Sequence, residues 1–98
     1  MAEYGRAVYS RIAASVQYPE RAARENRQGT VMLRLVVGTD GRLSDVSSVD
    51  GAADPVLRDA AIAAVRRAAP FAPPPRQVVG GDGTVSFRIP VRFYFSAR

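Results

Sequence analysis

The sequence contains no cysteine, no histidine and no lysine. Without cysteine the chain can form no disulfide and offers no thiolate chemistry, so the redox compartment stays undecided. Without histidine it lacks the commonest metal ligand and the usual general base at neutral pH. Catalysis would then depend on paired carboxylates, or on a metal held by carboxylates alone. We therefore expect neither an enzyme nor a bound metal or other cofactor.

Long apolar runs are also absent, since no stretch reaches the roughly 18 residues typical of a membrane-spanning helix. The opening residues Met1-Ala2-Glu3 do not begin a signal peptide. We expect the chain to be soluble as it stands, with any membrane anchor outside it. A length of 98 residues with 47% hydrophobic content fits one small domain, 1–98, with a single core.

The net charge of +5 comes from arginine alone, because there is no lysine. The arginines are interleaved with Asp and Glu along the chain and form no run of five or six like charges. We therefore do not expect nucleic acid as a partner. An anionic polymer such as peptidoglycan stays open as a ligand of another class, and such binding would weaken steeply with salt.

The clearest pattern lies in the C-terminal run 84–95, where apolar and polar residues alternate as in a half-buried β-strand. One face of this strand would be wet and the other would pack on the core. The residues on the core face are Val85, Phe87, Ile89, Val91, Phe93 and Phe95.

Pro90 indicates that this strand lies at the edge of its sheet, because proline has no N–H to donate to a ladder. Backbone groups alternate in direction along a strand, so the even-numbered residues would point theirs away from the domain. Ser86, Arg88, Arg92 and Tyr94 would then present unpaired backbone groups. Such an edge is either protected from pairing by charge and proline or used to dock another chain.

The rest of the chain is expected to form helices at 4–16, 19–26 and 54–69 and a hairpin of strands at 30–38 and 42–50. Pro19 suits the first position of the short helix, and Asp54 followed by Pro55 suits the start of the long one. Asp40-Gly41 predicts a tight primed turn in the hairpin, and a bulge near Asp45 would restore the returning strand's alternation. Residues 71–83 are expected to form a loop.

These elements predict an α+β domain, with helices packed on one face of a three-stranded antiparallel sheet. The helix between the second and third strands lets the last strand cross to the far side of the first. The expected order is 2-1-3, which places residues 84–95 on an outer edge, as Pro90 requires.

A series of short motifs, in this order and spacing, resembles the TonB C-terminal domain family from about Tyr9 to Phe95. The motifs are Gln17-Tyr18-Pro19-Glu20-Arg21-Ala22, Gly29-Thr30-Val31, Asp40-Gly41-Arg42, Asp45-Val46, Leu57-Arg58-Asp59-Ala60-Ala61, Arg66-Arg67, Pro70-Phe71 and Val91-Arg92-Phe93.

This resemblance implies the periplasmic end of an energy transducer whose inner-membrane anchor and proline-rich spacer are absent from the chain. It implies binding to the TonB box of an outer-membrane transporter, which adds as a strand beside the last strand. The family's Tyr-Pro motif contacts the same segment, which corresponds here to Gln17, Tyr18 and Pro19. An ExbB/ExbD-like complex is expected to bind only through the missing anchor.

Other interpretations stay open. A TolA-like domain, which bridges the envelope through other partners, has a similar layout, although Tyr18-Pro19 and the Val91-Arg92-Phe93 ending favour TonB. A homodimer formed by pairing free edge strands is a further alternative. The candidate partner-binding residues are Gln17, Tyr18, Pro19, Ser86, Arg88, Pro90, Arg92 and Tyr94.

Overall fold

The computed structural model describes residues 2–49 and 54–94 of the chain. It contains helices, strands and one short 3-10 helix in the order α1 (Ala2–Ala13), α2 (Glu20–Arg24), β1 (Gly29–Gly38), β2 (Leu43–Ser48), α3 (Pro55–Ala68), η1 (Arg76–Val78) and β3 (Thr84–Phe93). The helix η1 lies in the region expected to be an irregular loop. The expected strand ends at Asp50 and Phe95 lie outside the described residues.

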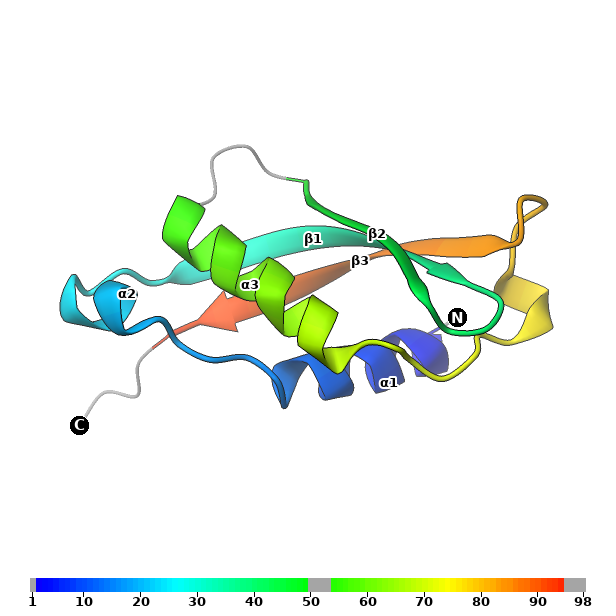
Figure 1. The fold of residues 1–98 in the computed structure, drawn as a ribbon, viewed down its shortest axis with the longest axis horizontal. Helices are drawn as coiled ribbons and strands as arrows, with labels where there is room; N and C mark the ends of the chain where they lie inside the picture. The colour runs from blue at the N-terminus through cyan, green and yellow to red at the C-terminus, as the bar shows by residue number, and fades with distance from the viewer. Residues whose placement is uncertain (1, 50–53, 95–98) are drawn as a thin grey trace.

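The strands form a three-stranded antiparallel sheet in the order β2-β1-β3, with β1 in the centre. Helices α1 and α3 lie on the same side of this sheet (Figure 1), α3 against β1 and β2, and α1 against β3. The α+β class, the strand order and the one-sided helical layer predicted from the sequence are confirmed. Strand β3 is an outer strand, as Pro90 indicated.

Strands β1 and β3 pair over their whole length, from Gly29 opposite Phe93 to Gly38 opposite Thr84. Strand β2 is shorter, and its register slips where Val36 pairs with Asp45 but Val37 pairs with Leu43. Ser44 is the extra residue, so the bulge expected near Asp45 is present. The β3 edge is therefore both the longer and the more regular of the two outer edges of the sheet.

The core follows directly from the alternation in the strands and the four-residue spacing in the helices. Odd-numbered residues of β1 and β3 face the helices, and the small residues of α3 allow it to lie close on the sheet. The buried apolar residues are Tyr4, Val8, Ile12, Ala22, Val31, Leu33, Leu35, Val37, Val46, Leu57, Ala61, Ala64, Val65, Ala68, Phe71, Val85, Ile89, Val91 and Phe93.

The hairpin between β1 and β2 differs from the primed turn predicted for it. Gly41 has a positive φ of 88°, but Asp40 does not, whereas a type I′ turn needs positive φ at both central residues. The amide of Gly41 donates to the carbonyl of Gly38, and the amide of Gly38 donates to the carbonyl of Arg42. These bonds close a three-residue loop, in which one left-handed glycine is enough.

Gly41 is also held close to the segment that follows α3. The amide of Phe71 donates to the Gly41 carbonyl at 2.9 Å. A Cβ at position 41 would lie 2.0 Å from the Phe71 carbonyl oxygen, which no side chain tolerates. The hairpin loop and the segment at Phe71 therefore hold each other in position. This contact sets the path of the chain between α3 and η1.

Helix α2 is bounded by proline and a left-handed residue. Pro19 is the N-cap, with φ −61° and ψ 134°, rather than the first helical residue expected from the sequence, because its ψ is extended. At the other end Asn26 has φ 54°, and the amide of Arg27 donates to the carbonyl of Ala22 at 2.8 Å. This is a Schellman arrangement, which stops the helix and turns the chain into β1.

Helix α3 begins as predicted at Asp54, whose carboxylate accepts hydrogen bonds from the amides of Val56 and Leu57. Arg27 also donates to both oxygens of this carboxylate, at 3.1 and 3.2 Å. Partial burial acts to raise the pKa of Asp54, but the two amides and the guanidinium outweigh it, so the pKa lies below its ordinary value. Asp54 therefore joins the start of α3 to the segment before β1.

Replacing Phe93 with alanine is expected to destabilise the domain strongly. The side chain is 1% exposed and its ring meets that of Tyr18 edge to face. Removing a buried phenylalanine typically costs about 3 to 5 kcal/mol of unfolding free energy. The neighbouring Tyr94 is 58% exposed, so Tyr94→Ala serves as the control and should stay within about 0.5 kcal/mol. Chemical denaturation would measure both, and a larger loss in Tyr94→Ala than in Phe93→Ala would show that the two faces of β3 are assigned the wrong way round.

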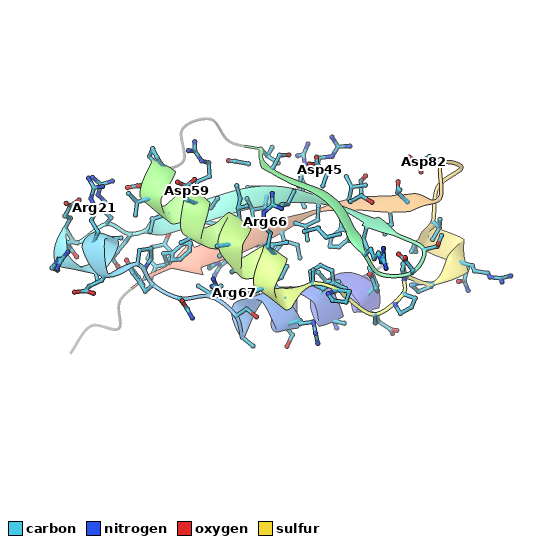
Figure 2. All side chains as sticks on the ribbon, in the orientation of Figure 1. Arg21, Asp45, Asp59, Arg66, Arg67 and Asp82 are labelled. Carbon is cyan, nitrogen blue, oxygen red and sulfur yellow. The ribbon has the colours of Figure 1, made fainter. Side chains whose placement is uncertain are left out.

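Because the folded-state pKa of Asp54 is lowered, its ionised form stabilises the fold above the unfolded-state pKa of about 4. That contribution is lost as the pH falls through the lower, folded-state pKa. Asp54→Asn keeps a capping oxygen but no charge, so its melting temperature is expected to fall less than that of the wild type on acidification. Asp59→Asn, at an exposed position on the same helix, is the control for removing one charge (Figure 2). Identical pH profiles for wild type and Asp54→Asn would contradict this role.

Candidate functional site

The backbone of β3 points its even-numbered groups away from the sheet. The amide of Val49 donates to the carbonyl of Met32 at 2.9 Å, so the even-numbered residues of β1 turn their backbone groups toward β2. The odd-numbered residues of β1 then turn their backbone groups toward β3, where their hydrogen-bonding partners include Ile89 and Val91. Pro90, paired with Met32, lies at a position that needs no donor. The even-numbered residues of β3 face outward.

The first part of this outward edge is closed by the chain itself. The amide of Gly80 donates to the carbonyl of Thr84 at 2.8 Å, and the amide of Thr84 donates to the Asp82 carboxylate at 3.0 Å. The Thr84 hydroxyl and the Thr84 amide, which both donate to the Asp82 carboxylate, hold the pKa of Asp82 below its ordinary value. Asp82 lies at the turn before β3, at one end of the molecule (Figure 2). The open edge therefore begins after Thr84.

Beyond Thr84 the edge is available. Within residues 2–49 and 54–94, no hydrogen bond joins α1 to the β3 backbone or caps the outward groups of Ser86, Arg88 and Arg92. Pro90 contributes an outward carbonyl but no N–H. The sequence-predicted residues of β3 thus lie together along one line. Tyr94 follows the end of the strand, and its hydroxyl lies 3.2 Å from the Thr30 hydroxyl.

The side chains of these edge residues lie on the sheet face that no helix covers. Ser86, Arg88 and Arg92 are exposed, whereas Pro90 is half-buried. Arg34 of β1 lies directly opposite Arg88 on the same face. Among the ion pairs within the described parts of the chain, none involves Arg34, Arg88 or Arg92. This face is therefore positive near the open edge.

Tyr18 lies beside the end of β3. Its ring meets Phe93 at 5.6 Å between centroids and an interplanar angle of 87°, and its hydroxyl donates to the carbonyl of Arg27. Partial burial raises the pKa of the Tyr18 phenol, so it remains a neutral donor. The structure thus brings Tyr18 to the same place as Pro90 and Arg92.

Gln17 and Pro19 are placed differently. They line a hollow between the segment before α2 and helix α3, together with Ala60, Ala63 and Arg67. That hollow lies on the helical layer, and Tyr18 separates it from the β3 edge. Of the sequence-predicted Tyr-Pro residues, only Tyr18 also lines the hollow that borders Pro90 and Arg92.

A hollow of about 290 Å³ lies between α1 and the β3 edge. It is mostly apolar and half-open, and Tyr9, one of its walls, is 38% exposed. The sequence placed the residues of α1 on a helix but gave no contact that would locate this helix beside β3. The hollow is lined by Tyr9, Ile12, Ala13, Val16, Tyr18, Pro90, Val91 and Arg92.

The chemistry available at this edge is recognition by backbone pairing and side-chain packing. Within the described ranges, no group of acidic residues is arranged to hold a metal ion. Of the helices in these ranges, none combines the length and the hydrophobicity that a membrane-spanning helix requires. The observed features match β-strand addition, in which main-chain bonds give affinity and pockets for alternate side chains give specificity.

Comparison with known proteins gives a family match. Residues 14–95 match the family model described as Gram-negative bacterial TonB protein C-terminal. The chain is 27% identical over 86 residues to the protein TonB of Helicobacter pylori, covering 88% of this chain and 29% of that protein. It therefore spans less than a third of the length of this curated relative.

Solved structures show the same fold. The solution structure of the Helicobacter pylori TonB C-terminal domain, residues 179-285, matches with a TM-score of 0.81 and 23% identity, covering 100% of this chain and 86% of that one. The structure of the HasB C-terminal domain matches with a TM-score of 0.59 and 28% identity, covering 96% of this chain and 77% of that one. On the family match, which covers most of the chain, this protein belongs to the Gram-negative bacterial TonB C-terminal domain family.

Proposed function

We propose that this chain is the periplasmic C-terminal domain of a TonB-like energy transducer, and that it binds the TonB box of an outer-membrane transporter as an added strand beside β3. Family membership supports the transducer role. The observation that carries the binding mode is the open outward edge of β3 between Ser86 and Arg92.

The edge suits an added strand for three structural reasons. It is the longer of the two outer edges. Its outward groups are unpaired after Thr84, whose carbonyl already accepts from Gly80, and Pro90 removes only one donor from it. Each net hydrogen bond contributes about 0.5 to 1.5 kcal/mol, so a few such bonds give modest affinity. Modest affinity suits a contact that forms and releases as energy is transferred.

The family match supports a TonB-like domain over a TolA-like one. The candidate contact residues of this proposal are Tyr18 and the edge residues Ser86, Arg88, Pro90 and Arg92. Tyr94 lies just beyond the strand and would flank the contact. Gln17 and Pro19 lie on the helical side, where a transporter segment beyond the added strand would reach them. A homodimer formed through the β3 edges would compete for the same backbone groups.

Arg92→Pro is expected to weaken binding of a TonB-box peptide at least tenfold. The substitution removes one outward N–H and leaves a peptide carbonyl unpaired, a combined loss above the roughly 1.4 kcal/mol that corresponds to tenfold. The fold should persist, because that N–H takes no part in the β1–β3 ladder. Isothermal titration calorimetry would measure the affinity, and circular dichroism would confirm the fold.

Arg92→Ala is the matched control, since it removes the same side chain but keeps the N–H. If both variants bind alike, the outward amide is not part of the contact. Titrations at rising salt add a further test, because binding of an anionic polymer falls steeply with salt. A backbone-paired peptide should respond far less, so a steep fall would favour the anionic-polymer alternative.

A further inference from the structure

The two sides of the β3 edge differ in chemistry, and this difference specifies the partner. On the helical side lies the apolar hollow of about 290 Å³ between α1 and Val91. On the uncovered side lie the side chains of Arg88 and Arg92, with Arg34 beside them on the neighbouring strand β1. A strand added to this edge would meet both surfaces at once.

The register of an added strand decides which side each of its residues faces. Residues opposite each other on neighbouring strands share a face of the sheet. A partner residue beside Val91 would therefore point into the apolar hollow, and one beside Ile89 would also face the helical layer. Partner residues beside Arg88 and Arg92 would lie on the uncovered face. This assignment holds for either direction of the added strand.

Repulsion between the arginines of the uncovered face lowers the stability of the free domain. Arg34 and Arg88 are directly opposite each other, and like charges at such positions destabilise a sheet. Their uncovered face carries one acidic residue among the described strand positions, Asp45, which lies on β2 at the far edge and pairs with Val36. Within the described ion pairs neither Arg88 nor Arg92 has a carboxylate partner. Acidic side chains on an added strand would relieve this repulsion.

The hollow on the helical side of the β3 edge has the size and the apolar lining to hold an apolar side chain. Its N-terminal wall consists of Ile12 and Ala13 of α1 and of Val16, which follows that helix, and Tyr9 and Tyr18 also line it. At about 290 Å³ it is at the lower limit of small-ligand pockets, so it fits amino-acid side chains better than a separate cofactor. Tyr9 is one of the large apolar side chains left exposed in the described structure.

We propose that the partner segment is an extended peptide with the pattern acidic, apolar, any residue, apolar, acidic. The acidic residues would lie beside Arg88 and Arg92, and an apolar residue would fill the hollow beside Val91. This inference rests on the proposed strand addition at β3 and adds to it the chemistry of the added strand. The pattern reads the same in both directions, as the geometry requires.

A set of short peptides of matched design tests the pattern. The central sequences are Asp-Ile-Thr-Ile-Asp, its neutral form Asn-Ile-Thr-Ile-Asn, its basic form Lys-Ile-Thr-Ile-Lys, and Ile-Ile-Thr-Asp-Asp, which has the first peptide's composition without its alternation. With each exposed charge pair expected to contribute about threefold, the acidic peptide should bind about tenfold more tightly than the neutral one. The basic and non-alternating peptides should bind more weakly still, and added salt should reduce the preference for acid.

Protein variants assign this preference to the two surfaces. In Arg88→Gln/Arg92→Gln the acidic and neutral peptides should bind within about twofold of each other, because the backbone edge remains but the charges are gone. The control Arg24→Gln/Arg66→Gln removes equal charge from the helical layer, where Figure 2 shows Arg66 on α3, and should keep the full preference. Ala13→Leu, which fills the hollow, should weaken binding of the acidic peptide, while circular dichroism should show an unchanged fold.

The outcomes separate this inference from the proposed function. If all four peptides bind equally and Arg92→Pro abolishes binding of each, strand addition stands and the acidic and apolar pattern is overturned. If the non-alternating peptide binds as tightly as the alternating one, charge attraction alone accounts for the preference and the pattern is again overturned. If neither these peptides nor a TonB-box peptide binds, strand addition at β3 is overturned and the pattern with it.

Discussion

The antiparallel pairing of β1 with β3 sets both the core and the open edge of this domain. It runs the whole length of both strands and fixes the direction of every backbone group on β3. Because Pro90 has no N–H to donate, the β1–β3 ladder keeps all its hydrogen bonds only if the backbone groups of Pro90 point away from β1. This orientation turns the even-numbered groups of β3 outward and the odd-numbered side chains into the core. The same register thus stabilises the domain and creates its open edge.

The N-terminal segment completes the edge on one side. Helix α1 is held by the Tyr4 hydroxyl, which donates to the Ala72 carbonyl at 2.8 Å, and by Arg11, which donates to the Ala68 carbonyl at 2.6 Å. The Tyr4 ring also meets Phe87 of β3 edge to face at 5.9 Å. These contacts place α1 alongside β3 without any described hydrogen bond to its backbone. The helix therefore adds a wall to the edge while leaving the outward groups of β3 unpaired.

Much of this arrangement was predictable from the sequence because it follows from local patterns. The alternation in 84–95 with Pro90 indicated an edge strand, and Asp54-Pro55 indicated the start of α3. The features that escaped prediction depend on contacts between distant segments. The hairpin closes as a three-residue loop in which Gly41 alone is left-handed, and Gly41 packs closely against the Phe71 backbone. The hollow beside Val91 requires α1 to be placed by Tyr4 and Arg11, which no periodicity reveals.

Amide hydrogen exchange measures whether the outward groups of β3 are open in the free domain and pair with an added strand. We expect fast exchange at Ser86, Arg88 and Arg92 and slow exchange at Phe87, Ile89 and Val91 in the free domain, because only the amides of the second group donate to β1. Saturation with a TonB-box peptide should slow the first group and leave the second unchanged. Protection of the Ser86, Arg88 and Arg92 amides before peptide is added would show that the edge is already closed, and unchanged exchange afterwards would rule out strand addition there.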